Sequence, residues 1–183
     1  MGTLILRIAA LAFLAAAWTP AGAQAERASD IQVKAAYLYQ FGGFIDWPPR
    51  AFAGDASPFV IGLIGADALA AELENVVATR TVHGRKVAVR RLRRGEALAG
   101  LHVLFVGAEA AAELPQVLGA ARDTPLLVVT DSENALSRGS TINFVAVDNR
   151  VRFDVALASA ERSQLRISSR LLSVARRVVK AES

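Results

Sequence analysis

The fold is decided by the stretch FVIGLIGAD, residues 59–67. Residues 59–64 form a nearly continuous apolar run, which is typical of a β-strand covered on both faces. Residues 67–77 then predict a helix, with Asp67 as its N-cap. The glycines lack the G-x-G-x-x-G order of a dinucleotide site, so we expect them to allow a tight turn from strand to helix. A buried strand that leads into a helix is the unit from which α/β domains are built.

The same pattern recurs downstream. Residues 102–106 and 126–130 are apolar runs that predict two more buried strands. The alanine-rich segment 108–121 between them predicts a helix that is interrupted at Pro115. Residues 86–92 alternate basic and apolar side chains, as expected of a strand with one solvated face. These elements predict a mainly parallel sheet with right-handed crossovers.

The two ends of the domain complete this pattern. A capping box, S-x-x-Q, predicts a helix from near Asp30 to before Pro48. Residues 142–155 contain two alternating runs around a central Asp-Asn pair, which predict a β-hairpin. Residues 170–180 predict a last helix. We therefore expect one layered α/β domain, with a mixed, mainly parallel sheet flanked by helices and a C-terminal β-hairpin as an edge.

The N-terminus has the layout of a cleaved secretory signal. Arg7 precedes the apolar run 8–18, and the small residues 21–23 follow. This run is shorter than the roughly 20 residues that are needed to span a bilayer. We expect cleavage after Ala23, or after Ala25 as the second choice, and a protein that works outside the cytoplasm. An uncleaved N-terminal anchor is the alternative.

The rest of the composition fits one domain. Removing 23 of the 183 residues leaves 160, which we divide into a short lead, residues 24–29, and a domain over residues 30–180. The precursor has a mild net charge of +4 and no cysteine, which excludes disulfides, thiol nucleophiles and thiolate metal sites. We expect no cofactor and no nucleic-acid partner.

Catalytic chemistry has few candidate residues. The two histidines, His83 and His102, do not have the spacing of zinc ligands. His102 opens a predicted buried strand and is expected to be hydrogen-bonded in the core, whereas His83 is expected in a solvated turn. Ser168 and Ser169 lack the surrounding G-x-S-x-G of a nucleophilic serine. We therefore predict no catalytic residue and no metal site.

A possible ligand cleft lies after the predicted strand 126–130. Asp131 and Ser132 follow the C-terminal end of this strand. Ligand clefts of α/β sheets form at such ends, so both residues are candidates for a small-molecule site. A helix cap made by either side chain is the alternative.

Aromatic residues crowd the end of the first predicted helix. They are Tyr37, Tyr39, Phe41, Phe44 and Trp47. One helical face cannot bury all of them, and aromatic anchors are common in protein interfaces. We expect at least Phe41 and Phe44 to pack in the core. The candidate partner-binding residues are Tyr37, Tyr39, Phe44 and Trp47.

A charge-dense segment provides a second candidate surface. Its basic residues are Arg85, Lys86, Arg90, Arg91, Arg93 and Arg94. Arg90 and Arg91 are the candidates for binding an acidic partner or anionic lipid head groups. The alternative is a solvated strand whose arginines pair with carboxylates. Because strand side chains alternate, these residues cannot all face one side.

Several ordered blocks make the chain resemble the YfiR family. The blocks are VKAAYLYQF (33–41), FIDWP (44–48), GRKV (84–87), RRL (90–92), HVLFV (102–106), LVVTD (127–131), INF (142–144), RVRFD (150–154) and ISSRLL (167–172). The resemblance covers about residues 30–176, which is nearly the whole expected mature chain.

The resemblance implies a periplasmic regulator without catalytic activity. Members similar to YfiR hold an inner-membrane diguanylate cyclase of the YfiN type inactive, which lowers cyclic di-GMP and biofilm formation. An outer-membrane lipoprotein of the YfiB type can sequester the repressor. The resemblance also implies a homodimer and an α/β sheet flanked by helices. The best-known relatives carry disulfide-forming cysteines, one of them at the place of Leu101, so control by disulfides is excluded here.

Two other functions stay open at this point. One is a periplasmic small-molecule sensor, with its ligand near Asp131, that acts on another membrane partner. The other is a hydrolase, for which the sequence offers few candidate bases.

Overall fold

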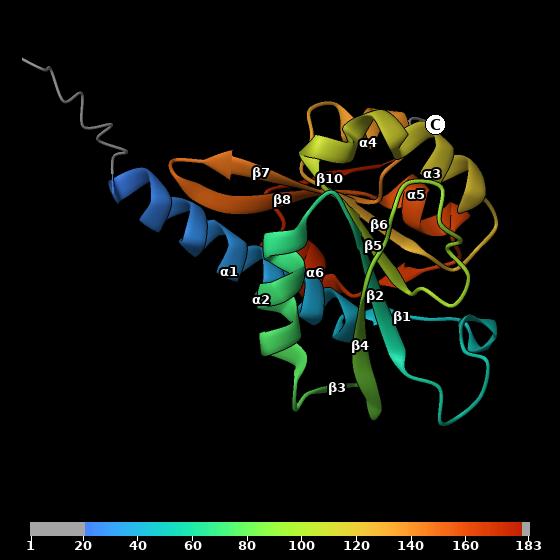
Figure 1. Ribbon diagram of the computed structural model, residues 1–183. Coiled ribbons are helices and arrows are strands. Elements are labelled where there is room, and N and C mark those ends of the chain that lie inside the picture. Colours follow the sequence, from blue (N-terminus) through green and yellow to red (C-terminus); the bar gives the residue numbers. More distant parts are fainter. Residues whose placement is uncertain (1–20, 181–183) are drawn as a thin grey trace, which may run out of the picture.

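The centre of the protein is an eight-stranded β-sheet (Figure 1). The computed structural model describes residues 21–180, with side chains from residue 26 onward. The strands of the large sheet are β2 (Phe59–Ile64), β3 (Thr81–Val82), β4 (Arg85–Arg91), β5 (Val103–Val106), β6 (Leu127–Thr130), β7 (Ile142–Val147), β8 (Arg150–Ala156) and β10 (Arg177–Val179). They lie in the order β10-β8-β7-β6-β5-β2-β4-β3. A separate antiparallel pair joins β1 (Ile45–Asp46) to β9 (Arg166–Ile167).

Most neighbouring strands are parallel, as the sequence predicts. β4, β2, β5, β6 and β7 run side by side in parallel, while β3 and β8 form antiparallel pairs with β4 and β7. The apolar run of residues 59–64 is β2, and each of its residues except Val60 is buried. The prediction of a mixed, mainly parallel sheet flanked by helices is therefore confirmed.

Helices cover both faces of this sheet. They are α1 (Ala21–Gly43), η1 (Pro49–Ala51), α2 (Asp67–Val77), η2 (Ala108–Glu113), α3 (Leu114–Ala120), α4 (Ala135–Arg138), α5 (Leu157–Arg162) and α6 (Ser169–Val174). The larger core cluster packs α1, α2 and α6 on one face, through Leu38, Leu73 and Leu171. A second cluster packs η2 and α3 on the other face, through Ala110 and Leu114. The strands of the sheet are therefore covered on both faces, as their continuous apolar runs require.

Two glycines make the turns after β2 and β5 tight. Gly65 has a φ of +63°, a left-handed conformation that favours glycine. A Cβ atom on Gly107 would collide with the carbonyl oxygen of Gly65. Asp67 is the first helical residue, and the cap position is Ala66, which makes no side-chain capping bond. The prediction of an Asp67 cap is therefore wrong, and this carboxylate instead lies in the first turn of α2, where negative charge favours a helix.

The C-terminal hairpin is present, but it is not the edge of the sheet. Asp148 and Asn149 join β7 to β8 with φ values of 47° and 57°, as a two-residue type I′ turn requires. β10 pairs in parallel with the outer side of β8. The prediction of a hairpin edge is corrected to a hairpin that lies one strand inward.

The prediction of a helix over residues 170–180 is wrong beyond Val174, where α6 ends and the chain continues into β10. Two contacts hold this segment against β8. The Nε of Arg176 lies 2.7 Å from the Oδ1 of Asp154, and the backbone N–H of Arg176 donates to the carbonyl of Phe153. These tertiary contacts outweigh the helical pattern of the segment, since propensity is only a weak prior.

The first helix is longer than the sequence predicts. α1 begins at Ala21, upstream of the expected start near Asp30, because the residues before the capping box are good helix formers. It ends at Gly43, before Pro48, as expected. The predicted signal peptide lies mostly outside the described residues. Within residues 21–180, no helix is both long enough and apolar enough to cross a membrane.

Candidate functional site

The aromatic end of α1 and the residues that follow it lie at a surface with two hollows. After α1, the chain passes through Phe44 into β1 and then reaches Trp47. The indole Nε1 of Trp47 donates to the carbonyl of Gly42 at 3.1 Å, which folds the ring back toward the helix end. The same ring packs edge-on against Phe59, with centroids 5.3 Å apart. Trp47 is therefore half-buried, with one side in the core and the other at the surface.

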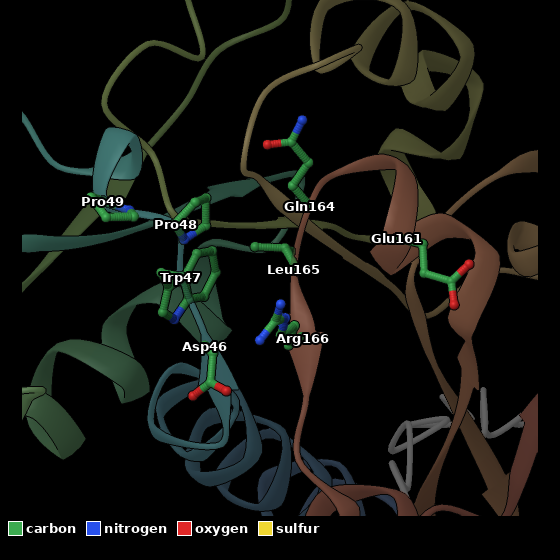
Figure 2. A pocket seen from close by; sticks show the side chains of 8 residues that line it. All are labelled: Asp46, Trp47, Pro48, Pro49, Glu161, Gln164, Leu165 and Arg166. Carbon is green, nitrogen blue, oxygen red and sulfur yellow. The ribbon is translucent and has the colours of Figure 1, made fainter.

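The first hollow has a volume of about 540 Å³ and lies beside Trp47 (Figure 2). Its lining residues are Asp46, Trp47, Pro48, Pro49, Glu161, Gln164, Leu165 and Arg166. Pairing of β1 with β9 sets Asp46 opposite Arg166, and so brings two segments far apart in sequence to one site. Aromatic and proline surface is combined here with charges of both signs, which is a composition common to binding sites.

The second hollow has a volume of about 340 Å³ and is lined in part by Phe44. Its lining residues are Tyr39, Gln40, Gly43, Phe44, Thr81, Val82 and His83. The hydroxyl of Tyr39 donates to the carbonyl of Thr81 at 3.1 Å, and the guanidinium of Arg80 lies 5.1 Å from the Tyr39 ring centroid. Tyr39 is thus held in place, at the boundary between α1 and the edge strand β3.

Tyr37 and Phe41 face inward. Phe41 is fully buried, which confirms its prediction as a core residue. The Tyr37 ring lies 5.2 Å from Phe153 and 6.0 Å from Phe144 between centroids, so it packs α1 against the β7–β8 hairpin. Phe44 is half-buried and packs against the same core. The five aromatic residues therefore divide between a core cluster and a surface that consists of Tyr39, Phe44 and Trp47.

Carboxylates neutralise part of the basic segment. Arg90 pairs with Glu96 at 3.2 Å, and Arg91 pairs with Glu74 of α2 at 2.9 Å. Arg85 instead donates to three carbonyls of the loop at residues 54–57, at 2.7 to 2.9 Å. These contacts correspond to the alternative of a strand whose arginines pair locally. Exposed pairs of this kind contribute little free energy, but they do reduce the charge available to a partner.

His102 is a core residue. Its side chain lies between the rings of Phe52 and Phe59, with centroid distances of 4.6 and 4.8 Å, and the residue is 2% exposed. Its Nδ1 accepts the backbone N–H of Val60 at 3.1 Å. Burial lowers the pKa of His102 to about 4, and the positive charge of Arg85 acts in the same direction. His102 is hydrogen-bonded in the core, as expected, and a neutral imidazole is the form that this environment favours.

His83 lies in a turn with a φ of 50°, and the residue is exposed. Its Nε2 lies 3.1 Å from the carbonyl oxygen of Gly42 and 3.3 Å from that of Ile45. The ring therefore links the turn before β4 to the end of α1. Residues 21–180 contain no cluster of three or more His, Asp or Glu side chains that is arranged to hold a metal ion.

The candidate ligand cleft at Asp131 coincides with a hollow of about 420 Å³ at the C-terminal ends of β2, β5 and β6. Oδ2 of Asp131 pairs with Nζ of Lys34 at 2.7 Å. Oδ1 of Asp131 and Oγ of Ser132 are buried and have no hydrogen-bond partner among residues 21–180. Asp131 lines the hollow and Ser132 does not. No helix begins directly at either residue, since α4 starts at Ala135 with Asn134 in the cap position.

Sequence reasoning missed the second wall of the hollow at Trp47. Glu161, Gln164 and Arg166 belong to α5, the turn after it, and β9. β1 and β9 have only two residues each, which is too short for a periodic signal. Only the tertiary pairing of these strands brings that wall to Trp47.

One of the comparisons with known proteins identifies a family for this chain. No curated protein matches the chain. The family described as YfiR/HmsC-like matches residues 31–176, which include both hollows beside the aromatic surface and nearly all of the large sheet. Over this range the chain belongs to the YfiR/HmsC-like family.

Proposed function

We propose that this protein is a periplasmic, non-catalytic regulator that represses an inner-membrane diguanylate cyclase by binding its periplasmic part. The observation that carries this proposal is the family match over residues 31–176, because the family is known for periplasmic regulators of YfiN-type cyclases. Repression lowers cyclic di-GMP and biofilm formation. The proposal includes cleavage after Ala23, a domain over residues 30–180, a homodimer, and release by a YfiB-type outer-membrane lipoprotein.

The proposed contact surface for the cyclase is the aromatic surface of Tyr39, Phe44 and Trp47. These three side chains are half-buried, so each is held by the core and still presents one side to a partner. One hollow beside Trp47 and another beside Tyr39 and Phe44 offer places for a partner's side chains. Rigid aromatic groups beside hollows match the composition and packing of interface hot spots. Tyr37 contributes by packing α1 against the hairpin, and Arg90 and Arg91 keep their carboxylate partners.

A pull-down tests this surface. The bait is the mature chain, residues 24–183, and the sample is the detergent-solubilised envelope of cells that express the cognate cyclase. Gln40→Arg places a long charged side chain in the hollow beside Tyr39 without removing any core group, because Gln40 is exposed. Gln32→Arg makes the same change at another exposed position of α1 and is the matched control.

We expect the unmodified bait to recover an inner-membrane protein with a cyclase domain. We expect Gln40→Arg to reduce this recovery at least about tenfold, which corresponds to about 1.4 kcal/mol, and Gln32→Arg to leave it unchanged. Equal recovery with both variants rejects the aromatic surface but not the repressor. Recovery of no cyclase by the unmodified bait contradicts the repressor itself.

A second candidate function is a small-molecule sensor at Asp131. It is favoured by the buried, unpartnered Oδ1 of Asp131 beside a hollow at the ends of the parallel strands. A ligand that prefers one state of the protein would shift the regulator between active and inactive forms. A thermal-shift screen of small amines and sugars tests it. A compound that stabilises the unmodified protein but not Asp131→Asn supports it, and the absence of any such compound counts against it.

A further inference from the structure

Another surface hollow, with none of the aromatic residues in its lining, is bordered by arginines. Its volume is about 710 Å³, within the range of small-molecule sites. Its lining residues are Pro115, Leu118, Gly119, Ala121, Arg122, Asp123, Val128, Arg138, Gly139, Thr141, Ser159, Arg162 and Ser163. We call it the arginine pocket, after Arg122, Arg138 and Arg162. Arg138 and Arg162 belong to α4 and α5, and Arg122 follows the end of α3; these three helices lie near one another at the upper right of Figure 1.

The three arginines are not neutralised by carboxylates. Within residues 21–180, none of them forms an ion pair, and Asp123 is the one acidic residue among those that line the pocket. Arg162 donates to the hydroxyl of Ser159 at 2.9 Å, and Arg138 donates to the carbonyl of Ala111 at 3.1 Å. A guanidinium has five N–H donors, so each of these contacts leaves most of its donors for another acceptor.

A further guanidinium lies beside the pocket. Arg50, from η1, donates to the backbone carbonyl of Asp123 at 3.2 Å and to the side chain of Gln164 at 2.7 Å. It therefore adds positive charge next to the one aspartate of the pocket. This contrasts with the basic segment of β4, where Arg90 and Arg91 each have a carboxylate partner. An anion that enters the arginine pocket would therefore meet an excess of positive charge.

Hydroxyl groups lie deeper in the same pocket. Thr141 is 2% exposed and Ser159 is 5% exposed, whereas the three arginines are exposed residues. The pocket therefore combines a charged rim with buried hydroxyls and with apolar surface from Leu118 and Val128. Such an arrangement gives an anion charge-assisted hydrogen bonds at the rim and neutral donors inside.

Helix ends alone do not account for these arginines. Arg138 and Arg162 lie in the last turns of α4 and α5, where a cation interacts favourably with the helix dipole. These helices have four and six residues, so few aligned peptide dipoles act on each arginine. Arg122 lies beyond the end of α3 and has no side-chain hydrogen bond within the described residues. Within residues 21–180, three arginines without carboxylate partners line one hollow, and a capping role leaves this grouping unexplained.

We propose that the arginine pocket binds a small molecule that carries two or more phosphate or carboxylate groups. Guanidinium groups bind both kinds of oxyanion in a bidentate geometry, and several arginines around one hollow favour a ligand with more than one anionic group. This site is separate from the aromatic surface and does not depend on the cyclase as a partner. It gives the regulator a place to respond to an anionic metabolite.

Isothermal titration calorimetry of the mature chain tests the proposal, with pyrophosphate and citrate as probes and inorganic phosphate for comparison. We expect pyrophosphate or citrate to bind more tightly than inorganic phosphate. Arg122→Gln removes a guanidinium with no internal partner, and it should weaken binding about tenfold. Arg91→Gln makes the same charge change at an ion pair elsewhere, and it should leave binding unchanged. Arg122→Lys keeps the charge and should restore part of the affinity.

Three results would overturn the proposal. The first is no heat of binding for pyrophosphate or citrate up to about 10 mM, well above the affinities typical of small-molecule sites. The second is an equal loss of affinity in Arg91→Gln and Arg122→Gln, which would mean general charge attraction. The third is sedimentation with phosphatidylglycerol vesicles that requires Arg122 while the soluble anions do not bind, which would assign the pocket to lipid head groups. Matching urea unfolding curves for all variants establish that each one is folded.

Discussion

His102 packs in the core of this protein, although imidazole is a common catalytic group. The imidazole is stacked between Phe52 and Phe59, and its Nδ1 satisfies the backbone N–H of Val60. An unpaired backbone N–H in this environment would cost free energy, so the histidine stabilises the start of β2. Burial of the His102 imidazole also disfavours its charged form.

The stability of the protein should therefore fall at acidic pH because of His102. Its pKa is about 4 in the folded protein and about 6.5 when exposed, so protons favour the unfolded state. This contribution is fully present above about pH 6.5 and is lost as the pH falls toward 4, by about 3 kcal/mol. Urea unfolding at pH 7 and pH 4 should show a larger loss for the unmodified protein than for His102→Phe. An equal loss in both proteins would contradict this role.

Among the elements, β10 is held in place by one buried charge, the carboxylate of Asp154. Burial by itself would raise the pKa of Asp154, but the hydrogen bonds and charges of Arg176 and Arg177 outweigh it and hold the pKa below its ordinary value. Arg177 is the first residue of β10, and Arg176 directly precedes it. Without this carboxylate, the segment would lose the contact that holds it on β8.

Asp154→Asn should loosen β10 and destabilise the protein. The amide keeps the shape of the side chain but loses the charge that Arg176 and Arg177 share. We expect a loss of about 1–3 kcal/mol in the free energy of unfolding at pH 7, because the carboxylate is buried while both arginines are partly exposed. Urea unfolding measures the loss, and hydrogen exchange should show faster exchange at residues 177–179. Arg177→Gln, which leaves the Arg176 contact in place, should cost less. An Asp154→Asn protein as stable as the unmodified one would refute the anchor.

The longer elements were predictable from sequence because their periodic signals are strong. The run of residues 59–64 and the helix of residues 67–77 match β2 and α2. The two-residue strands β1 and β9 gave no such signal, although they create the hollow beside Trp47. The helix expected over residues 170–180 failed because a tertiary ion pair decided that segment.

Candidate sites were predictable only where their residues are neighbours in sequence. Tyr39, Phe44 and Trp47 stand close together in the chain, so their density was visible before the fold was known. Arg122 follows α3 and Arg162 lies in α5, so the two are far apart in sequence, and each looks like an ordinary surface residue. Local charge density pointed to the segment of β4 instead, where carboxylates from α2 and the following loop neutralise the arginines.

The whole molecule contains an α/β domain of the YfiR/HmsC-like family, and we propose that it restrains a cyclase in the inner membrane without being a catalyst itself. Such a regulator needs a rigid scaffold and a contact surface rather than a catalytic constellation. The aromatic surface at the end of α1 is supported by both core and edge strand, and this rigidity limits the entropy lost on binding.

The most direct test is the cellular level of cyclic di-GMP after deletion of this gene, measured by mass spectrometry in cells that express the cognate cyclase. We predict that the level of cyclic di-GMP rises at least severalfold and returns to its original value when residues 1–183 are supplied in trans. Supplying the Gln40→Arg variant, which is altered at the proposed contact surface, should not restore the level. The matched variant Gln32→Arg should restore the level. An unchanged level of cyclic di-GMP after deletion, with the cyclase present in the membrane, would contradict the account.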